Sequence, residues 1–244
     1  FRKYDGPYDR KGYGFPVGNG NIENALSKLK TDAENENSDF QFCFLSESQK
    51  DMLDKLYPDT FSFSTDEGDS DYIYRTKGLA QLKGHKYHKH KNKVSKFCKS
   101  YPQMEIRKID ETNVCDAIEV EEKWLSEHNE DKMFIVERDA IFEALKYIKP
   151  LDLNGIIIYA NNKPVAMSVS SVINNRVCDI HFEKSYGEYA NNGGYSAICS
   201  YMANELKEIE YLNREEDLGI SGLRKSKMSY HPLVIYKKYI ARSC

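Results

Sequence analysis

The sequence lacks any long apolar run. None of its stretches approaches the roughly 18–20 consecutive apolar residues that a membrane-spanning helix needs. The first residues, Phe1-Arg2-Lys3-Tyr4, lead into polar, glycine-rich sequence and do not resemble a signal peptide. The chain does not begin with Met, so we expect that further residues precede it. These absences predict a cytoplasmic protein with no transmembrane segment in this chain.

Paired cysteines are missing as well. The six cysteines are scattered over 244 residues without a CxxC pair. Such spacing favours neither a zinc site nor a disulfide framework, and free thiols are typical of a reducing compartment. His85, His88 and His90 are spaced like metal ligands, but no cysteine or acid accompanies them and the neighbouring lysines would repel a cation. We therefore predict no metal site.

The sequence also lacks a strong excess of charge of one sign. The 35 Lys and Arg residues nearly balance the 38 Asp and Glu residues, giving a net charge of −3. This balance disfavours a wholly basic nucleic-acid binder, and we expect no DNA partner.

Residues 83–99 depart from this balance, with seven lysines, three of the six histidines and no acid. Val94, Phe97 and Tyr101 are spaced as one helix face, which leaves the other faces basic. The segment is either a solvated charge run or a patch for the phosphates of RNA or lipid headgroups. The candidate patch residues are Lys86, His88, Lys89, Lys91 and Asn92.

The apolar spacing predicts strands and helices in alternation, which is a mixed α/β (α+β) chain. The second half has the order β-α-α-β-β-β-α-β-α-β, with an antiparallel meander followed by a crossover helix. The expected strands are 104–109, 155–160, 164–172, 176–183, 209–213 and 234–240, and the expected helices are 110–128, 138–148, one from Tyr195 and one from Gly222. This order is similar to that of the GNAT acyltransferase superfamily.

Four segments resemble one known family. They are residues 210–232, EYLNREEDLGISGLRKSKMSYHP; 181–184, HFEK; 71–74, DYIY; and 79–92, LAQLKGHKYHKHKN. Together they are similar to the C-terminal domain family of bacterial phosphatidylglycerol lysyltransferases. The resemblance implies tandem GNAT-like acyltransferase folds, with mixed central sheets flanked by helices. It implies an N-terminal half at 1–102, truncated at its start, and a complete C-terminal domain at 103–244.

The resemblance also implies an activity. Named members of the family move an aminoacyl group from a charged tRNA to a lipid hydroxyl. The expected donor is therefore aminoacyl-tRNA, and the expected acceptor is an anionic lipid or another small hydroxyl or amine compound. A lipid acceptor would place the protein peripherally at the inner membrane face.

The sequence departs from these relatives at several points. Lys91 stands where an Arg is expected before Asn92, and the membrane spans of the lysyltransferases are absent. The nearest match to the acetyl-CoA signature of GNAT enzymes, residues 191–196, lacks the first and last signature residues, so acyl-CoA is disfavoured and no cofactor is expected. The alternatives are an acyl-CoA-dependent N-acetyltransferase and a non-catalytic module that binds RNA or a membrane surface.

A glycine pair marks the expected site. A strand leads through a loop to Gly193 and Gly194, and a helix begins at Tyr195. A glycine turn at a helix start leaves backbone N–H groups free for an anion or a carbonyl oxygen. These three residues are predicted to bind the reacting ester, and the alternative is an ordinary turn glycine.

His181 and Glu183 are candidate catalytic residues. They are two residues apart on a strand, so we expect both side chains on one face, next to the glycine turn. Acyl transfer needs a base that makes the nucleophile more reactive, and either residue is a candidate. In the alternative, His181 is a structural histidine and Glu183 pairs with Lys184 or Arg214.

Polar residues near the end of the chain supply the remaining candidates. Arg224 and Lys227 are three apart on one helical face, which suits a phosphate or a tRNA 3′ end. Tyr230 is a candidate proton donor, by analogy with GNAT enzymes that use a late tyrosine. The alternatives are a salt-bridge network that fixes the last helix and ordinary packing of the tyrosine. The predicted substrate-binding residues here are Asn213, Arg214, Asp217, Arg224 and Lys227.

Overall fold

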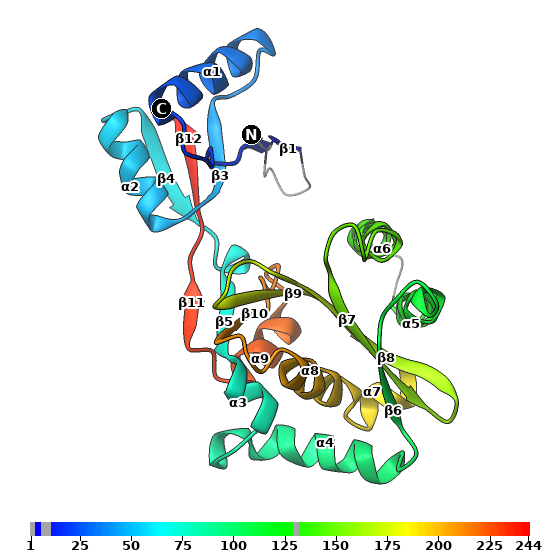
Figure 1. Ribbon diagram of the computed structural model, residues 1–244. Coiled ribbons are helices and arrows are strands. Elements are labelled where there is room, and N and C mark those ends of the chain that lie inside the picture. Colours follow the sequence, from blue (N-terminus) through cyan, green and yellow to red (C-terminus); the bar gives the residue numbers. More distant parts are fainter. Residues whose placement is uncertain (1–2, 6–10, 129–131) are drawn as a thin grey trace. The chain divides into compact units, whose positions relative to one another are not determined.

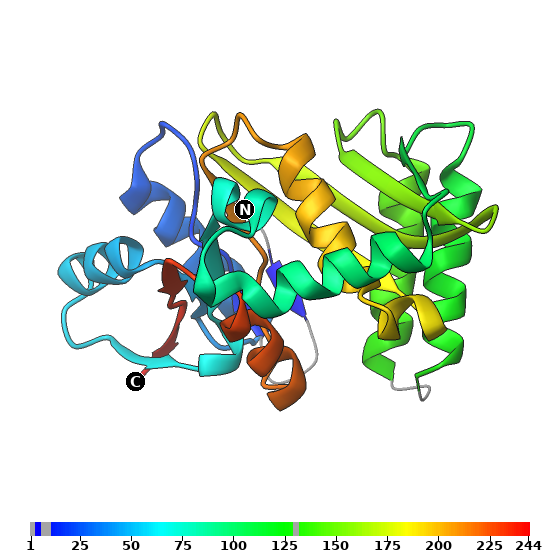
Figure 2. The ribbon, with the colours of Figure 1, turned by 90° about the horizontal axis from the view of Figure 1, so that it is seen from below.

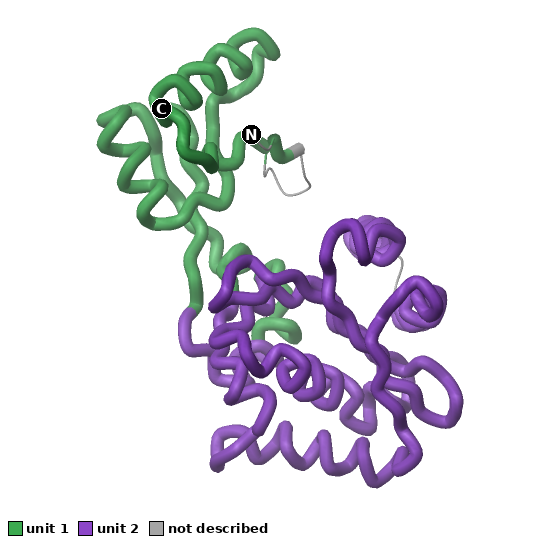
Figure 3. Tube along the Cα trace, in the orientation of Figure 1, with its two compact units in different colours: residues 1–71, 216–224, 235–244 green, residues 72–215, 225–234 purple. Residues whose placement is uncertain are grey.

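The computed structural model describes residues 3–5, 11–128 and 132–244. The chain forms two compact units (Figure 3). Unit 1 comprises residues 1–71, 216–224 and 235–244, and unit 2 comprises residues 72–215 and 225–234. The expected GNAT-like halves at 1–102 and 103–244 divide the sequence into two repeats, whereas these units divide the structure by compactness. The two repeats therefore stay a prediction.

Unit 1 is built on a mixed five-stranded sheet with two helices (Figure 1). Helix α1, Ile22–Asn35, begins where the Asn21 side chain accepts the backbone N–H of Asn24 at 2.8 Å. Helix α2, Glu47–Leu56, begins with a capping box of Ser46 and Gln49. The sheet order is β1-β2-β3-β12-β4, with β1 Lys3–Asp5, β2 Lys11–Tyr13, β3 Gln41–Leu45, β12 Tyr239–Ser243 and β4 Phe61–Thr65, after which the turn η1 spans Glu67–Asp69.

The second sheet, most of whose residues belong to unit 2, is mixed and has the order β11-β5-β10-β9-β8-β7-β6. Strands β7, β8 and β9 form the expected antiparallel meander, and β10 runs parallel to β9. The bounds are β11 Val234–Tyr236, β5 Asp71–Arg75, β10 Tyr211–Asn213, β9 Val177–Ser185, β8 Lys163–Val172, β7 Asn154–Ala160 and β6 Glu105–Lys108. Two mixed sheets flanked by helices confirm the predicted fold class.

Helices cover both faces of the sheet in unit 2. Figure 1 shows α5 and α6 on one face and α8, α3 and α4 on the other, and Figure 2 shows α4 crossing α8. Helix α8 lies between the sheet and these neighbours, so it is buried nearly all round rather than along one stripe. The bounds are α3 Thr76–Gln81, η2 His85–Tyr87, α4 His88–Ser100, α5 Val114–Ser126, α6 Lys132–Lys146, α7 Gly187–Asn191, α8 Gly194–Glu205 and α9 Ser221–Ser229.

The single strand predicted at 234–240 is wrong. The chain forms two short strands there, β11 in the seven-stranded order and β12 in the five-stranded one. Lys238 lies between them, and its Nζ contacts Asp71 Oδ1 at 2.6 Å and Glu216 Oε2 at 3.2 Å. This buried pairing holds the chain where it leaves one sheet for the other. Strand β4 was not expected from the sequence.

Within the described ranges, no helix is both long and apolar enough to cross a membrane.

The pairing of β9 positions the candidate site. Strand β10 pairs with β9 from Val177 to Asp179 and ends at Asn213, so residues 180–185 of β9 extend beyond it. The register between β8 and β9 also shifts beside His181, which makes His181 the additional residue of a β-bulge. Arg214 and Glu215, which follow β10 directly, lie beside the uncovered part of β9.

Candidate functional site

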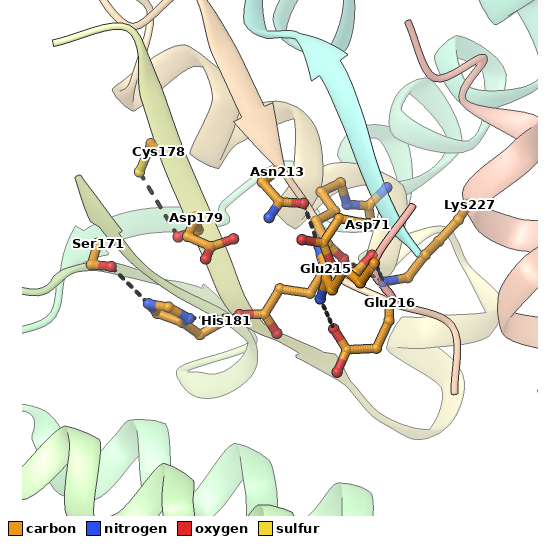
Figure 4. Close-up of polar contacts among 11 residues, drawn as sticks. Asp71, Ser171, Cys178, Asp179, His181, Asn213, Glu215, Glu216 and Lys227 are labelled. Atoms are coloured by element: carbon orange, nitrogen blue, oxygen red, sulfur yellow. Dashed lines mark hydrogen bonds and ion pairs between the residues drawn. The ribbon is translucent and has the colours of Figure 1, made fainter. Parts of the chain in front are cut away.

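His181 is hydrogen-bonded through both ring nitrogens. Its Nδ1 lies 2.8 Å from Glu215 Oε1, and its Nε2 lies 2.8 Å from Ser171 Oγ. Figure 4 shows the ring between these two side chains, which come from β8 and from the segment after β10. The side chains of His181 and Glu215 are 29% and 34% exposed, so the group is open to solvent on one side.

Glu215 is held in an unusual backbone conformation. Its φ is +54°, in the left-handed region that costs a non-glycine residue roughly 1–2 kcal/mol. Three hydrogen bonds keep it there: its N–H donates to Asn213 Oδ1 at 2.9 Å, and its carbonyl oxygen accepts from Tyr72 N at 3.3 Å and Lys227 Nζ at 3.1 Å. The strained conformation directs the carboxylate toward the ring of His181.

Glu215 controls the chemistry of the histidine. The hydrogen bond to its carboxylate raises the pKa of His181, and burial opposes this rise. In the neutral ring with Nδ1–H donating to Glu215, Nε2 has a lone pair that accepts the Ser171 hydroxyl proton. This arrangement suits a general base, with Glu215 placed to orient the ring and stabilise its charged form, and the catalytic role of His181 stays a prediction.

Asp179 extends the same group. One ligand atom each from Asp179, His181 and Glu215 lie within 4.8 Å of one another. Both nitrogens of His181 already have hydrogen-bonding partners, so a cation bound there would have to replace one of those bonds. The prediction of no metal site stays a prediction.

Glu183 belongs to a different, buried cluster. Its Oε2 contacts Arg214 Nη2 at 2.5 Å and Nε at 2.8 Å, and the two side chains are only 12% and 13% exposed. The Arg214 guanidinium also lies over the ring of Tyr230, 4.8 Å from its centroid. His181 and Glu183 thus have separate partners despite their spacing in the sequence, because the bulge at His181 interrupts the alternation of β9.

Tyr230 is packed inside this cluster. It is 3% exposed, its hydroxyl lies 3.1 Å from Ser196 Oγ, and its ring stacks on His90 at 3.5 Å between centroids. Burial raises the pKa of Tyr230 above its ordinary value, which makes the hydroxyl a weaker acid. These contacts are what packing of the tyrosine predicts, and its role as proton donor stays a prediction.

The other substrate-binding candidates also have partners inside the protein. Arg224 Nε contacts the buried Asp217 Oδ2 at 2.7 Å, and its Nη1 reaches Glu67. Lys227 is 7% exposed, and its Nζ donates to the carbonyl oxygens of Arg214 and Glu215. These bonds are those of the salt-bridge alternative. Lys227 thereby fixes the backbone that presents Glu215, and phosphate binding by Arg224 and Lys227 stays a prediction.

The glycine turn is closely packed. Gly193 has φ +107°, and a side chain there would meet the carbonyl oxygen of Lys93 on α4. A side chain at Gly194 would meet Ser185 Oγ. Close approach of α4 and β9 therefore accounts for both glycines. Tyr195, next in the chain, is 40% exposed and its hydroxyl accepts a hydrogen bond from Trp124 Nε1 at 2.6 Å.

The basic segment forms η2 and α4. All five candidate patch residues, Lys86, His88, Lys89, Lys91 and Asn92, are exposed there. A depression of about 450 Å³ lies on this helix, lined by Asn92, Ser95, Lys96, Lys99 and Ser100. His90 points inward, 5% exposed, and burial lowers its pKa to about 4, so it is neutral at pH 7.

A second buried charge cluster lies where α5 and α6 meet β9. Lys184 Nζ contacts Glu137 Oε2 at 2.7 Å and Glu121 Oε2 at 3.7 Å, and it lies 3.4 Å from the ring centre of Trp124. Glu121 is fully buried, and this burial raises its pKa to about 7 despite the nearby lysine.

A family model provides the decisive comparison. The model for phosphatidylglycerol lysyltransferase, C-terminal, matches residues 11–242, nearly the whole chain. The chain belongs to this family. Membership supports a function of the aminoacyltransferase kind.

The chain is also similar to individual proteins. An uncharacterised protein of Mycoplasmoides gallisepticum is 29% identical over 187 residues, which are 72% of this chain but only 57% of that protein. A crystal structure of a conserved protein of unknown function from Bacteroides thetaiotaomicron is 34% identical, with a TM-score of 0.88 over 97% of this chain and 80% of that one. The C-terminal domain of a putative lysylphosphatidylglycerol synthetase from Agrobacterium fabrum is 14% identical, with a TM-score of 0.69 over 95% of this chain and 76% of that one. This last likeness shows a shared fold.

Sequence reasoning missed two partners of His181 in this family member. Glu215 lies within the motif NREED, of which the sequence analysis selected only Asn213, Arg214 and Asp217. Ser171 is one of several serines on β8, and no local pattern sets it apart. Both residues acquire their meaning from the pairing of strands.

Proposed function

We propose that this chain transfers an aminoacyl group from aminoacyl-tRNA to a hydroxyl or amine acceptor, with an anionic lipid such as phosphatidylglycerol as the first acceptor to test. The observation that carries the proposal is the orientation of His181 by Glu215, in a chain of the lysyltransferase family. Family membership supports the reaction class, and the histidine supplies the proton acceptor that this class needs.

The chemistry follows from the ester donor. Attack on the ester carbonyl requires a hydroxyl or amine that loses its proton as the new bond forms, and the departing tRNA hydroxyl requires a proton. His181 Nε2 takes the first proton and returns it in the second step. Glu215 stabilises the imidazolium between the two steps, as a carboxylate does for a histidine base in acyl transfer.

The cationic face of α4 supports a donor that carries phosphates. Lys89, Lys96 and Lys99 are exposed on a helix without acidic residues, beside a depression of about 450 Å³. Lysine ammonium groups bind the phosphate backbone of nucleic acids without reading its sequence. The proposal assigns this face to the tRNA.

A transfer assay tests the proposal. The protein is mixed with a set of radiolabelled aminoacyl-tRNAs and either phosphatidylglycerol vesicles or small hydroxyl and amine acceptors, and label is followed out of the tRNA fraction. We expect transfer that is lost in His181→Ala. The matched control is His85→Ala, which removes an exposed histidine from η2.

The outcomes separate the alternatives. No transfer with any donor and acceptor would remove the proposal. RNA or vesicle binding that weakens with salt and persists in His181→Ala, without turnover, would point to the non-catalytic module. Thermal stabilisation by micromolar acetyl-CoA would point to the acyl-CoA-dependent alternative.

A further inference from the structure

Three side chains around His181 have the order of a nucleophile, a base and an acid. Ser171 Oγ lies 2.8 Å from Nε2, and Glu215 Oε1 lies 2.8 Å from Nδ1. Both distances are those required between a hydroxyl nucleophile, its histidine base and the carboxylate that orients the base. We propose that Ser171 is a nucleophile and that the transferred acyl group passes through an ester on its Oγ. This inference rests on the proposed function for the identity of the donor.

The carboxylate of Glu215 is held in place by the protein's own hydrogen bonds, without a bound substrate. Glu215 keeps a left-handed backbone conformation against its intrinsic cost, through hydrogen bonds to Asn213, Tyr72 and Lys227. With Nδ1–H held by Glu215, the basic Nε2 faces Ser171 and no other tautomer satisfies both bonds. A serine that only filled a space on β8 would not require this preorganisation.

Ser171 differs from the serines before it on the same strand. Ser168 and Ser170 are both fully buried, and Ser170 Oγ donates to the carbonyl oxygen of Asn154 at 3.4 Å. Ser171 is partly exposed, where β8 reaches the surface. The next two residues, Val172 and Ile173, are apolar and are 48% and 56% exposed. A substrate can therefore reach the hydroxyl of Ser171 and not those of its neighbours.

The first half of the reaction charges the serine. Ser171 Oγ forms a bond to the carbonyl carbon of the donor ester while its proton moves to His181 Nε2. The bond between that carbon and the tRNA 3′ ribose oxygen then breaks, and the ribose oxygen takes the proton from His181. The products are an acyl ester of Ser171 and a tRNA with a free hydroxyl.

The second half of the reaction transfers the acyl group from Ser171 to the acceptor. The acceptor hydroxyl or amine gives a proton to His181 Nε2 and attacks the same carbonyl carbon. The bond to Ser171 Oγ breaks, and the serine oxygen takes that proton. No oxidant, reductant or further reactant is needed, and the enzyme returns to its starting state.

The experiment traps the acyl-enzyme with a donor that does not depend on tRNA. The full chain is incubated with p-nitrophenyl acetate, quenched in acid and digested, and the acetylated peptide is located by mass spectrometry. In parallel, a fluorophosphonate probe reports serine reactivity. We expect a burst of nitrophenol close to one equivalent and an acetyl group on Ser171. Labelling is expected to fall at least about 100-fold in His181→Gln and to disappear in Ser171→Ala.

The variants carry their own controls. Ser170→Ala removes the neighbouring buried hydroxyl and is expected to keep the label on Ser171. Ser171→Cys restores a nucleophile at the same atom and is expected to form a thioester. Thermal melting of each variant separates a lost nucleophile from a lost fold.

The results distinguish this inference from the proposed function. An unlabelled Ser171 in folded wild-type protein, or aminoacyl transfer that is unimpaired in Ser171→Ala, overturns the nucleophile and leaves direct transfer with His181 as base. An acetylated Ser171 in a protein that accepts no aminoacyl-tRNA supports the nucleophile and removes the proposed donor.

Discussion

His181 and Glu183 lie two residues apart on β9, yet their surroundings differ sharply. His181 and its partner Glu215 are about one third exposed, and the second ring nitrogen of His181 faces a hydroxyl at the surface. Glu183 and its partner Arg214 are about one eighth exposed and lie against aromatic rings. An ion pair of the first kind contributes little to stability but is accessible for chemistry, whereas one of the second kind is costly to break and is largely shielded from solvent.

Replacement of His181 by alanine is the strongest way to break this contrast. We expect kcat/KM for aminoacyl transfer to fall by roughly 10²–10⁴-fold, because a positioned base contributes that much to proton transfer. The melting temperature should change little, since the pair with Glu215 is partly exposed. Transfer kinetics and calorimetry on the same preparation measure both. A variant that stays active would show that His181 is not the base.

Replacement of Arg214 by alanine should have the opposite profile. It leaves Glu183 buried without its partner, and we expect a loss of about 3–5 kcal/mol in the free energy of unfolding. Urea denaturation measures the loss. Arg75→Ala is the control, because its ion pair with Glu210 is exposed and should contribute at most about 1 kcal/mol. Equal losses for the two variants would mean that burial does not separate them.

Glu121 extends the comparison to the other face of β9. Its pKa is raised by burial to about 7 from 4.5, so the folded protein holds a proton that the unfolded chain releases. The contribution of Glu121 to stability should therefore be greatest below pH 4.5 and be lost as the pH rises through 7, by about 2–3 kcal/mol. Glu121→Gln removes that dependence. The difference in unfolding free energy between variant and wild type should grow with pH, and a flat difference would contradict the raised pKa.

His90 should respond to pH in the opposite sense. Burial lowers its pKa to about 4, with Lys93 and Arg214 adding to the effect, so protonation favours the unfolded chain. Its contribution is present above pH 6.5 and is lost as the pH falls through 4, by about 2 kcal/mol. His90→Gln is expected to lose less stability than wild type between pH 6.5 and 4. Denaturant titrations at stepped pH test this, with the exposed His85→Gln as the control.

The cationic face of α4 is expected to give the smallest effect. Reversing Lys96 and Lys99 to glutamate should weaken tRNA binding by roughly 3–10-fold at physiological salt and reduce its salt dependence, because fewer phosphate contacts release fewer counterions. Lys207→Glu, an exposed lysine elsewhere in unit 2, should leave binding nearly unchanged. Filter binding at several salt concentrations compares the variants. Equal losses for all three positions would indicate a general charge effect rather than a patch.

The elements that lie close together in the sequence were largely predictable. The strands expected at 155–160 and 164–172 and the helix expected from Tyr195 rest on local signals, and each matches an observed element, β7, β8 and α8. The run at 234–240 misled the prediction, because apolar alternation does not say which sheet a strand joins. Lys238 decides that point through its distant partners Asp71 and Glu216.

The candidate site was predictable in part. His181 was selected because it was expected to share a strand face with Glu183 next to the glycine turn, and the structure gives it partners that suit a base. Gly193 and Gly194 were selected for a conformational reason that is real, but the close approach of Lys93 and Ser185 occupies the space beside them. Arg224 and Lys227 were selected for their charge. In the structure Arg224 pairs with Asp217, and Lys227 donates to the carbonyl oxygen of Glu215.

Residue types and their periodicity alone were enough to predict a mixed α/β chain with a basic helix, because those signals repeat over short stretches. The acyltransferase expectation came from the resemblance of longer motifs to a known family. The choice of partners required the folded chain. Ser171, His181 and Glu215 come from three separate segments, and a bulge of one residue together with a left-handed backbone at Glu215 brings their atoms to hydrogen-bonding distance. Strand register and backbone strain depend on contacts between distant segments, so no local pattern in the chain encodes them.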